Sequence, residues 1–84
     1  MYEVKFVTSA AKEFRSLEHG IKRRVAAAIE NLQENPRPRG VRKLRGHTCL
    51  YRIRVGSYRV VYEIEDNIRL IRVTRIRHRR EVYR

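Results

Sequence analysis

Cysteine and acidic side chains are scarce in this chain, and tryptophan is absent. Cys49 is the single cysteine, so no disulfide can form within the chain, and a disulfide-stapled secreted scaffold is excluded. No apolar run approaches the roughly 20 residues of a membrane-spanning helix, and residues 1–8 lack the apolar segment of a signal peptide. We therefore expect a cytoplasmic protein that does not span a membrane.

Motifs that commonly carry chemistry are also missing. The sequence has no glycine-rich phosphate loop, no nucleophile elbow and no paired carboxylates. His19, His47, His78 and Cys49 lack the spacing of a metal site, and each is better interpreted as a structural or exposed residue. We therefore expect neither a metal nor another cofactor.

Positive charge is what the chain has in excess. Its 84 residues include 21 Lys and Arg against 9 Asp and Glu, which gives a formal net charge of +12. The length allows one small core, so we expect a single domain over residues 1–84. Most of the cations are arginines, which pair bidentately with phosphate and stack on bases. Nucleic acid is therefore the favoured partner, while an acidic protein or an anionic membrane surface are alternatives.

The residue pattern predicts one strand, two helices and three further strands. We expect a first helix capped by Thr8 or Ser9 and broken at residues 19–20, then a longer helix that Asn35 and Pro36 end. Strands are expected at residues 2–7, 51–55, 58–64 and 68–76, with a loop over residues 35–47. The predicted fold class is α+β in the order β-α-α-β-β-β. The first strand would join a mainly antiparallel sheet, and a helical hairpin would cover one face.

A β-hairpin is expected around Gly56-Ser57, within the run YRIRVGSYRVVY at residues 51–62. A type II′ turn with glycine first would place Val55 opposite Tyr58 and fix the register of both strands. One face of the hairpin is then apolar.

On the other face Arg54 would lie directly opposite Arg59, with Arg52 diagonal to Arg59. Like charges across a strand pair are destabilising, so we interpret this cluster as a polyanion site. The alternative is an ordinary solvated face. Residues 75–84, RIRHRREVYR, add further cations and a tyrosine that suits stacking on an unpaired base.

Three segments together resemble the RelE branch of the RelE/ParE toxin superfamily. They are KLRG at residues 43–46, the hairpin run at residues 51–62 and HRREVY at residues 78–83. The resemblance extends over nearly the whole chain and implies the toxin of a type II toxin–antitoxin pair. RelE toxins enter the ribosomal A site and cut mRNA there, when a 2′-hydroxyl attacks the adjacent phosphate. The expected activity is thus a metal-independent, ribosome-dependent endoribonuclease.

The resemblance also implies the site residues. Arg59 corresponds to a stabiliser of transition-state charge, Arg79 to the acid and Tyr83 to the residue that orients or stacks on the base. A gapless alignment through residues 81–83 would choose Arg77 in place of Arg79. The implied catalytic residues are Arg52, Arg54, Arg59, Arg79 and Tyr83, and further cations expected to bind RNA are Lys43, Arg45, Arg77 and Arg80.

The identity of the general base is a difficulty for this assignment. Some members of the family have two lysines where this chain has Arg52 and Arg54. Arginine keeps its proton up to a pKa of roughly 12.5 or above, so it is a poor base. Catalysis would then rest mainly on geometry and charge.

Two other functions stay open. One is a ParE-like protein that poisons DNA gyrase without nuclease chemistry, and the other is a non-catalytic module that binds nucleic acid through a helix-turn-helix. For the favoured function, the expected partners are the ribosome, with its rRNA and A-site mRNA, and an acidic RelB-like antitoxin. We expect a heterodimer or heterotetramer with that antitoxin.

Overall fold

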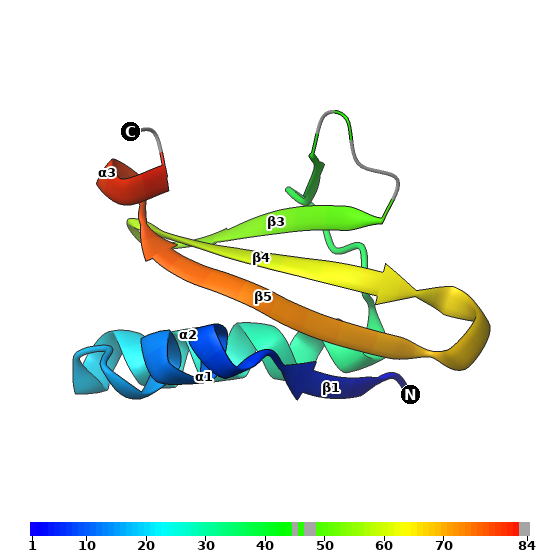
Figure 1. Cartoon of the computed structure of the whole chain (residues 1–84), viewed down its shortest axis with the longest axis horizontal. Coiled ribbons are helices and arrows are strands. Elements are labelled where there is room, and N and C mark those ends of the chain that lie inside the picture. Colours follow the sequence, from blue (N-terminus) through cyan, green and yellow to red (C-terminus); the bar gives the residue numbers. More distant parts are fainter. Residues whose placement is uncertain (45, 47–48, 83–84) are drawn as a thin grey trace.

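Figure 1 shows the fold in a computed structural model that describes residues 1–44, 46 and 49–82. The strand, the two helices and the three longer strands follow one another in the predicted order. The elements are β1 (Glu3–Phe6), α1 (Thr8–Arg15), α2 (His19–Glu34), β2 (Arg42–Lys43), β3 (Leu50–Val55), β4 (Tyr58–Glu65), the 3₁₀ turn η1 (Asp66–Ile68), β5 (Leu70–His78) and α3 (Arg79–Val82).

The strands form one sheet in the order β1-β5-β4-β3-β2. β1 runs parallel to β5, while the other neighbouring strands are antiparallel. The helices α1 and α2 run in opposite directions along one face, and α3 lies at the end of β5 on the side away from them (Figure 1). This arrangement confirms the predicted α+β fold. In the part of the chain that the structure describes, no helix has the length and apolar character needed to span a membrane.

The core lies between the sheet and α2. The helix buries Val25, Ile29 and Leu32, whose spacing places them on one stripe. Tyr62 in the central strand is fully buried, and its hydroxyl donates to the carbonyl oxygen of Pro36 at 2.7 Å. Burial raises the pKa of Tyr62, so its phenol remains a neutral donor. The predicted end of the helix before Pro36 is confirmed, and this hydrogen bond ties that end to the sheet.

The predicted start of α1 and the predicted break between the helices are wrong. Val7, rather than Thr8 or Ser9, holds the N-cap position of α1. The chain turns at residues 16–18, and residues 19–20 form the first turn of α2. Gly20 does not break the helix, because the carbonyl of Glu18 accepts the N–H of Lys22 and closes the first helical turn around this glycine.

The strands also differ from the prediction, most clearly in a short added strand and at both ends of β5. The expected loop over residues 35–47 contains β2, which is too short to show an alternating pattern. Ile68 belongs to η1, and Arg69 adopts a left-handed φ of 51°, so β5 begins only at Leu70. At its other end β5 continues to His78, two residues past the predicted limit, and α3 follows directly.

Candidate functional site

The hairpin of β3 and β4 has the predicted turn and register. Gly56 has a φ of 60°, and Ser57 does not share its positive φ, which is the pattern of a type II′ turn. Val55 pairs with Tyr58, and Arg54 pairs with Arg59. The sequence therefore predicted correctly which arginines of this hairpin share a face.

Arginines line up across three neighbouring strands on the face away from α1 and α2. Arg59 in β4 pairs with Arg54 of β3 on one side and with Arg77 of β5 on the other. We call these three residues the arginine row. Each strand neighbour places its side chain on the same side of the sheet, so three guanidinium groups project from adjacent positions.

A second row lies one step further along the strands. Arg52 pairs with Arg42 of β2, and on its other side Val61 separates it from Arg75 of β5. Together the two rows form what we call the arginine face. Its members are Arg42, Arg52, Arg54, Arg59, Arg75 and Arg77.

A β-bulge in β5 brings the arginines of this strand to that face. The register shifts between Val61 and Tyr62, so Thr74 is an extra residue, and its hydroxyl donates to the carbonyl of Val61 at 3.2 Å. If Thr74 were paired in an ordinary strand without the bulge, strict alternation from Val73 would turn Arg75 and Arg77 toward the core. The signal in the sequence is the step from Val73 to Ile76, since two core residues three positions apart break the period of two.

Arg59 is far more buried than a solvent-facing position implies. It lies on the predicted face of the hairpin, but its relative exposure is only 4%, so this position is not an ordinary solvated one. The central strand places it between Arg54 and Arg77, and α3 packs against β4 and β5. The Nε atoms of Arg52 and Arg59 are both buried. These two side chains are therefore held within the face, while Arg54 is exposed.

Glu13 of α1 contacts the β5 end of the arginine row. Its Oε1 accepts the backbone N–H of Ile76 at 2.8 Å, and its Oε2 accepts the Nε–H of Arg77 at 3.0 Å. The sequence analysis did not single out Glu13. No local pattern could have found it, because the contact joins residues more than sixty positions apart.

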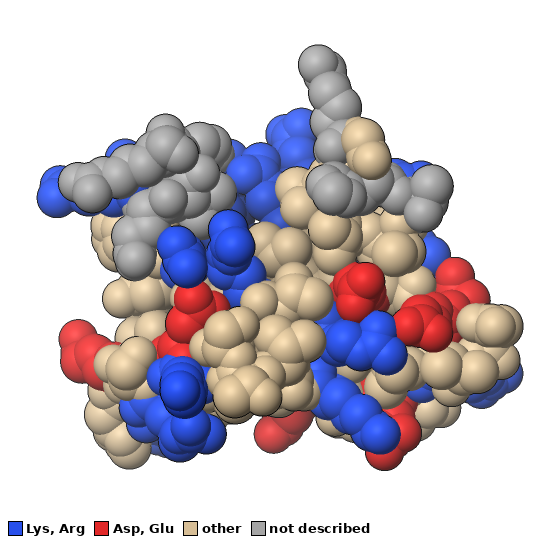
Figure 2. All heavy atoms as spheres, viewed as in Figure 1, with Lys and Arg blue, Asp and Glu red and all other residues tan. Residues whose placement is uncertain are grey.

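At the opposite end of the same sheet face, two carboxylates neutralise the charge of an arginine. Arg72 pairs with Glu63 at 3.0 Å and with Glu65 at 2.7 Å. The hydrogen bonds that Arg72 donates to these carboxylates, the one to Glu65 foremost, raise its pKa. In Figure 2, Lys and Arg lie both along the upper side, over the face that α1 and α2 leave open, and in the lower part of the view, whereas the described Asp and Glu that are visible lie in its middle and lower parts.

The C-terminal cations lie at the start of α3. Arg79 and Arg80 are both exposed, and the backbone N–H of Arg79 donates to the carbonyl of Ser57 at 2.7 Å. Nδ1 of His78 accepts the N–H of Arg80 at 3.2 Å, and its ring packs edge-on against Tyr58 at 5.2 Å. Arg77, and not Arg79, therefore belongs to the arginine row.

The remaining predicted site residues lie apart from the row or outside the described residues. Lys43 is exposed and pairs with Tyr51, whose side chain belongs to the core face, so its neighbour Arg42 joins the arginine face instead. Arg45 and Tyr83 lie outside the described residues.

One arginine outside the face has a structural role. The guanidinium of Arg37 pairs with Asp66 at 2.9 Å and lies 5.1 Å from the centre of the Tyr51 ring. Tyr2 donates to the same carboxylate at 2.6 Å. Hydrogen bonds from Arg37 and then Tyr2 lower the pKa of Asp66. Arg37 thus fixes the segment after α2 against the sheet.

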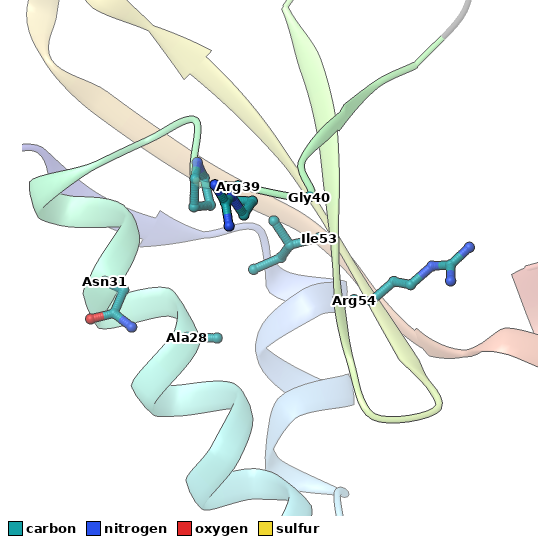
Figure 3. A pocket seen from close by; sticks show the side chains of 7 residues that line it. Ala28, Asn31, Arg39, Gly40, Ile53 and Arg54 are labelled. Carbon is teal, nitrogen blue, oxygen red and sulfur yellow. The ribbon is translucent and has the colours of Figure 1, made fainter.

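A hollow of about 290 Å³ lies beside the outer edge of β3, next to α2. Ala28 and Asn31 of α2, residues 38–40, Ile53 and Arg54 line it. Figure 3 shows Ile53 pointing toward α2 and Arg54 pointing away from it. The hollow therefore opens on the helix side of β3, and the arginine row lies on the other side.

A family model matches residues 4–83, and its family is described as the ParE toxin of type II toxin-antitoxin system, parDE. A curated relative, the putative RelE-like toxin protein of Escherichia coli, is 34% identical over 86 residues, which cover 98% of this chain and 90% of the relative.

Two solved structures are similar along most of their length. The isolated RelE toxin of E. coli superimposes with a TM-score of 0.84 at 30% identity, covering 99% of this chain and 92% of that one. The archaeal RelE-RelB complex from Pyrococcus horikoshii OT3 gives a TM-score of 0.83 at 32% identity, covering 93% and 94%.

Proposed function

Because this chain belongs to the RelE/ParE family of type II toxin–antitoxin toxins, we propose that it is a metal-independent endoribonuclease that cuts mRNA in the ribosomal A site. A 2′-hydroxyl gives up its proton and attacks the adjacent phosphate. The bond to the 5′-oxygen breaks, this oxygen takes up a proton, and the products carry a cyclic phosphate and a 5′-hydroxyl. Such cleavage would inhibit translation in the cytoplasm.

The arginine row is the observation that carries the proposal. Negative charge grows on the phosphate oxygens as the fifth bond to phosphorus forms, and fixed cations stabilise it best. Arg54, Arg59 and Arg77 project from adjacent positions on three paired strands. Strand pairing fixes their backbone spacing before RNA arrives, so little reorganisation is needed when the charge develops.

Four members of the arginine face take part in this mechanism. Arg59, buried at the centre, stabilises the charged phosphate, and Arg54 and Arg52 hold neighbouring oxygens. For the C-terminal acid, the position of Arg77 opposite Arg59 supports Arg77 over Arg79. The remaining cations, Lys43, Arg45, Arg79 and Arg80, would bind RNA around the site, and Tyr83 would stack on a base.

Proton removal from the 2′-hydroxyl does not require a strong base in this proposal. The arginine pKa of roughly 12.5 or above makes Arg52 and Arg54 poor proton acceptors. His78 follows Arg77 in β5 and pairs with Tyr58, and its Nδ1 already accepts the N–H of Arg80. Charge stabilisation and the geometry imposed on the mRNA by the ribosome would therefore supply most of the rate.

The proposed partner is an acidic, RelB-like antitoxin. One similar solved structure is a RelE-RelB complex. The formal charge of +12 and the concentration of arginines on this face suit an acidic chain that covers the face and thereby blocks access to RNA. The chain and this antitoxin would form a heterodimer or a heterotetramer.

A gyrase poison is the second candidate, because the matching family model carries the ParE name. It would act by trapping gyrase on cleaved DNA and would need no phosphate-binding row. Trapped cleavage complexes in a supercoiling assay, with no cut in ribosome-bound mRNA, would support this candidate instead.

The deciding experiment incubates antitoxin-free protein with ribosomes programmed with a defined mRNA and maps the new 5′ ends. We expect cuts within the A-site codon and none in the same mRNA without ribosomes. Arg54→Gln should slow cleavage about 100-fold or more, the usual cost of removing one transition-state donor. Arg23→Gln, at an exposed position of α2, removes the same charge away from the face and should cut normally. A folded wild-type protein that leaves the mRNA intact would refute the proposal.

A further inference from the structure

Glu13 occupies an edge of the sheet that no strand covers within the described residues. β1 pairs with β5 only along residues 70–73, and beyond that point α1 packs against the edge of β5. There the Glu13 carboxylate takes the place of a neighbouring strand, because its Oε1 accepts the N–H of Ile76 at 2.8 Å. The strand thus fixes the position of the carboxylate.

The second oxygen of the same carboxylate fixes the next residue. Oε2 accepts the Nε–H of Arg77 at 3.0 Å, and the pair is partly shielded, with side-chain exposures of 39% for Arg77 and 23% for Glu13. A carboxylate held at both oxygens cannot rotate without breaking one bond. The ion pair uses Nε only, so both Nη groups of Arg77 lie outside it and can meet a phosphate oxygen.

Affinity for RNA does not explain an acidic group at this place. A carboxylate beside a phosphate site repels phosphate, and its charge lowers the attraction that the neighbouring arginines exert. A role in orienting the Arg77 side chain does explain why a carboxylate lies here. Arg77 stands at the end of a row of like charges, and an anchored anion beyond that end draws its guanidinium into one direction.

We infer that Glu13 is a positioning residue of the arginine row, which holds Arg77 in the orientation used for phosphate chemistry; this rests on the proposed endonuclease function. Glu13 does not itself contact the phosphate. Because α1 packs against β5, Glu13 can fix the direction of the Arg77 side chain. The first helix thereby takes part in the site on the opposite face of the sheet.

Glu13→Gln separates this role from a charge effect. The amide oxygen can still accept the N–H of Ile76, but its NH₂ group meets the Nε–H of Arg77, so two donors face each other. We expect kcat on programmed ribosomes to fall about tenfold to a hundredfold, as expected for a misplaced catalytic group. Affinity for RNA should stay equal or rise, because one negative charge is gone. Glu30→Gln, exposed on α2, makes the same charge change and should leave kcat unchanged.

The Arg77→Gln background provides the coupling test. Glu13→Gln should cost nothing further there, because the side chain that it positions is already absent. In the wild type the Arg77 Nε–H should exchange slowly with solvent by NMR, and Glu13→Gln should speed that exchange while thermal unfolding confirms the fold. An active wild type with an equally active Glu13→Gln variant, or an undiminished loss in the Arg77→Gln background, would overturn the inference. An inactive wild type would instead refute the endonuclease itself.

Discussion

Arg59 and Arg77 lie directly opposite each other across β4 and β5, and the β-bulge that accommodates Thr74 keeps both on one face of the sheet. The bulge lets Ile76 stay in the core while Arg77 turns to the other face. The same β-bulge therefore determines both the core packing of β5 and the arrangement of the arginines. An all-cationic row would be hard to explain by stability alone, because neighbouring strands oppose like charges.

Arg54→Gln should stabilise the free protein. Arg54 is exposed and lies opposite Arg59, so its removal relieves repulsion between like charges. We expect the free energy of unfolding in urea to rise by about 0.2–1 kcal/mol at low salt, the scale of a cross-strand pair. The gain should shrink in high salt, which screens exposed charges. Arg23→Gln is the matched control and should change little; a loss of stability in Arg54→Gln at low salt would contradict the assignment.

Inorganic phosphate should raise the melting temperature more than chloride at equal ionic strength. An anion that binds only the folded state stabilises it by mass action, and the arginine row presents adjacent guanidinium groups to a tetrahedral anion. Low millimolar phosphate is enough to test this without general salt effects. The shift should be smaller in Arg54→Gln than in Arg23→Gln. Equal shifts in both variants would place the bound anion elsewhere.

The sequence predicted the hairpin but not the whole site, for physical reasons. Gly56-Ser57 is a local signal, and a two-residue turn fixes the register of every pair that follows. The residue of β5 that pairs with Arg59 could not be predicted from the turn. The connection between β4 and β5 contains η1, and the bulge at Thr74 shifts the pairing of the two strands by one residue.

Other features depend on contacts that leave no local pattern. Glu13 reaches β5 only after α1 has packed against the edge of the sheet, and β2 is too short to alternate. The burial of Arg59 likewise follows from its place in the central strand beneath neighbouring elements. The sequence pattern therefore predicts which face of a strand a residue occupies, but the exposure of its side chain depends on the elements packed around it.

Asp66→Asn should destabilise the protein at neutral pH and have no effect in acid. Hydrogen bonds from Arg37, and next from Tyr2, hold the pKa of Asp66 below its ordinary value of 3.8. A carboxylate whose pKa is lower in the folded state contributes stability above pH 3.8, and this contribution is lost as the pH falls through the folded-state pKa.

Urea unfolding measured from neutral to acidic pH tests this. The wild-type and Asp66→Asn curves should lie apart at neutral pH and converge in acid. Glu34→Gln, at an exposed position, should follow the wild type throughout. A constant gap between wild type and Asp66→Asn across the whole range would mean that packing, and not the charge of Asp66, is responsible.

His78 should determine how firmly α3 is held at the end of β5. Its Nδ1 accepts the N–H of Arg80, one of the first donors of α3, and its ring packs against Tyr58. In His78→Ala that donor loses its partner, so amide exchange at Arg80 should accelerate severalfold. His78→Asn offers a side-chain oxygen that can cap the same N–H and should restore most of the protection. Exchange at the core residue Val60 should not change in either variant, since it depends on the sheet. Equal exchange at Arg80 in the wild type and His78→Ala would contradict this role of His78.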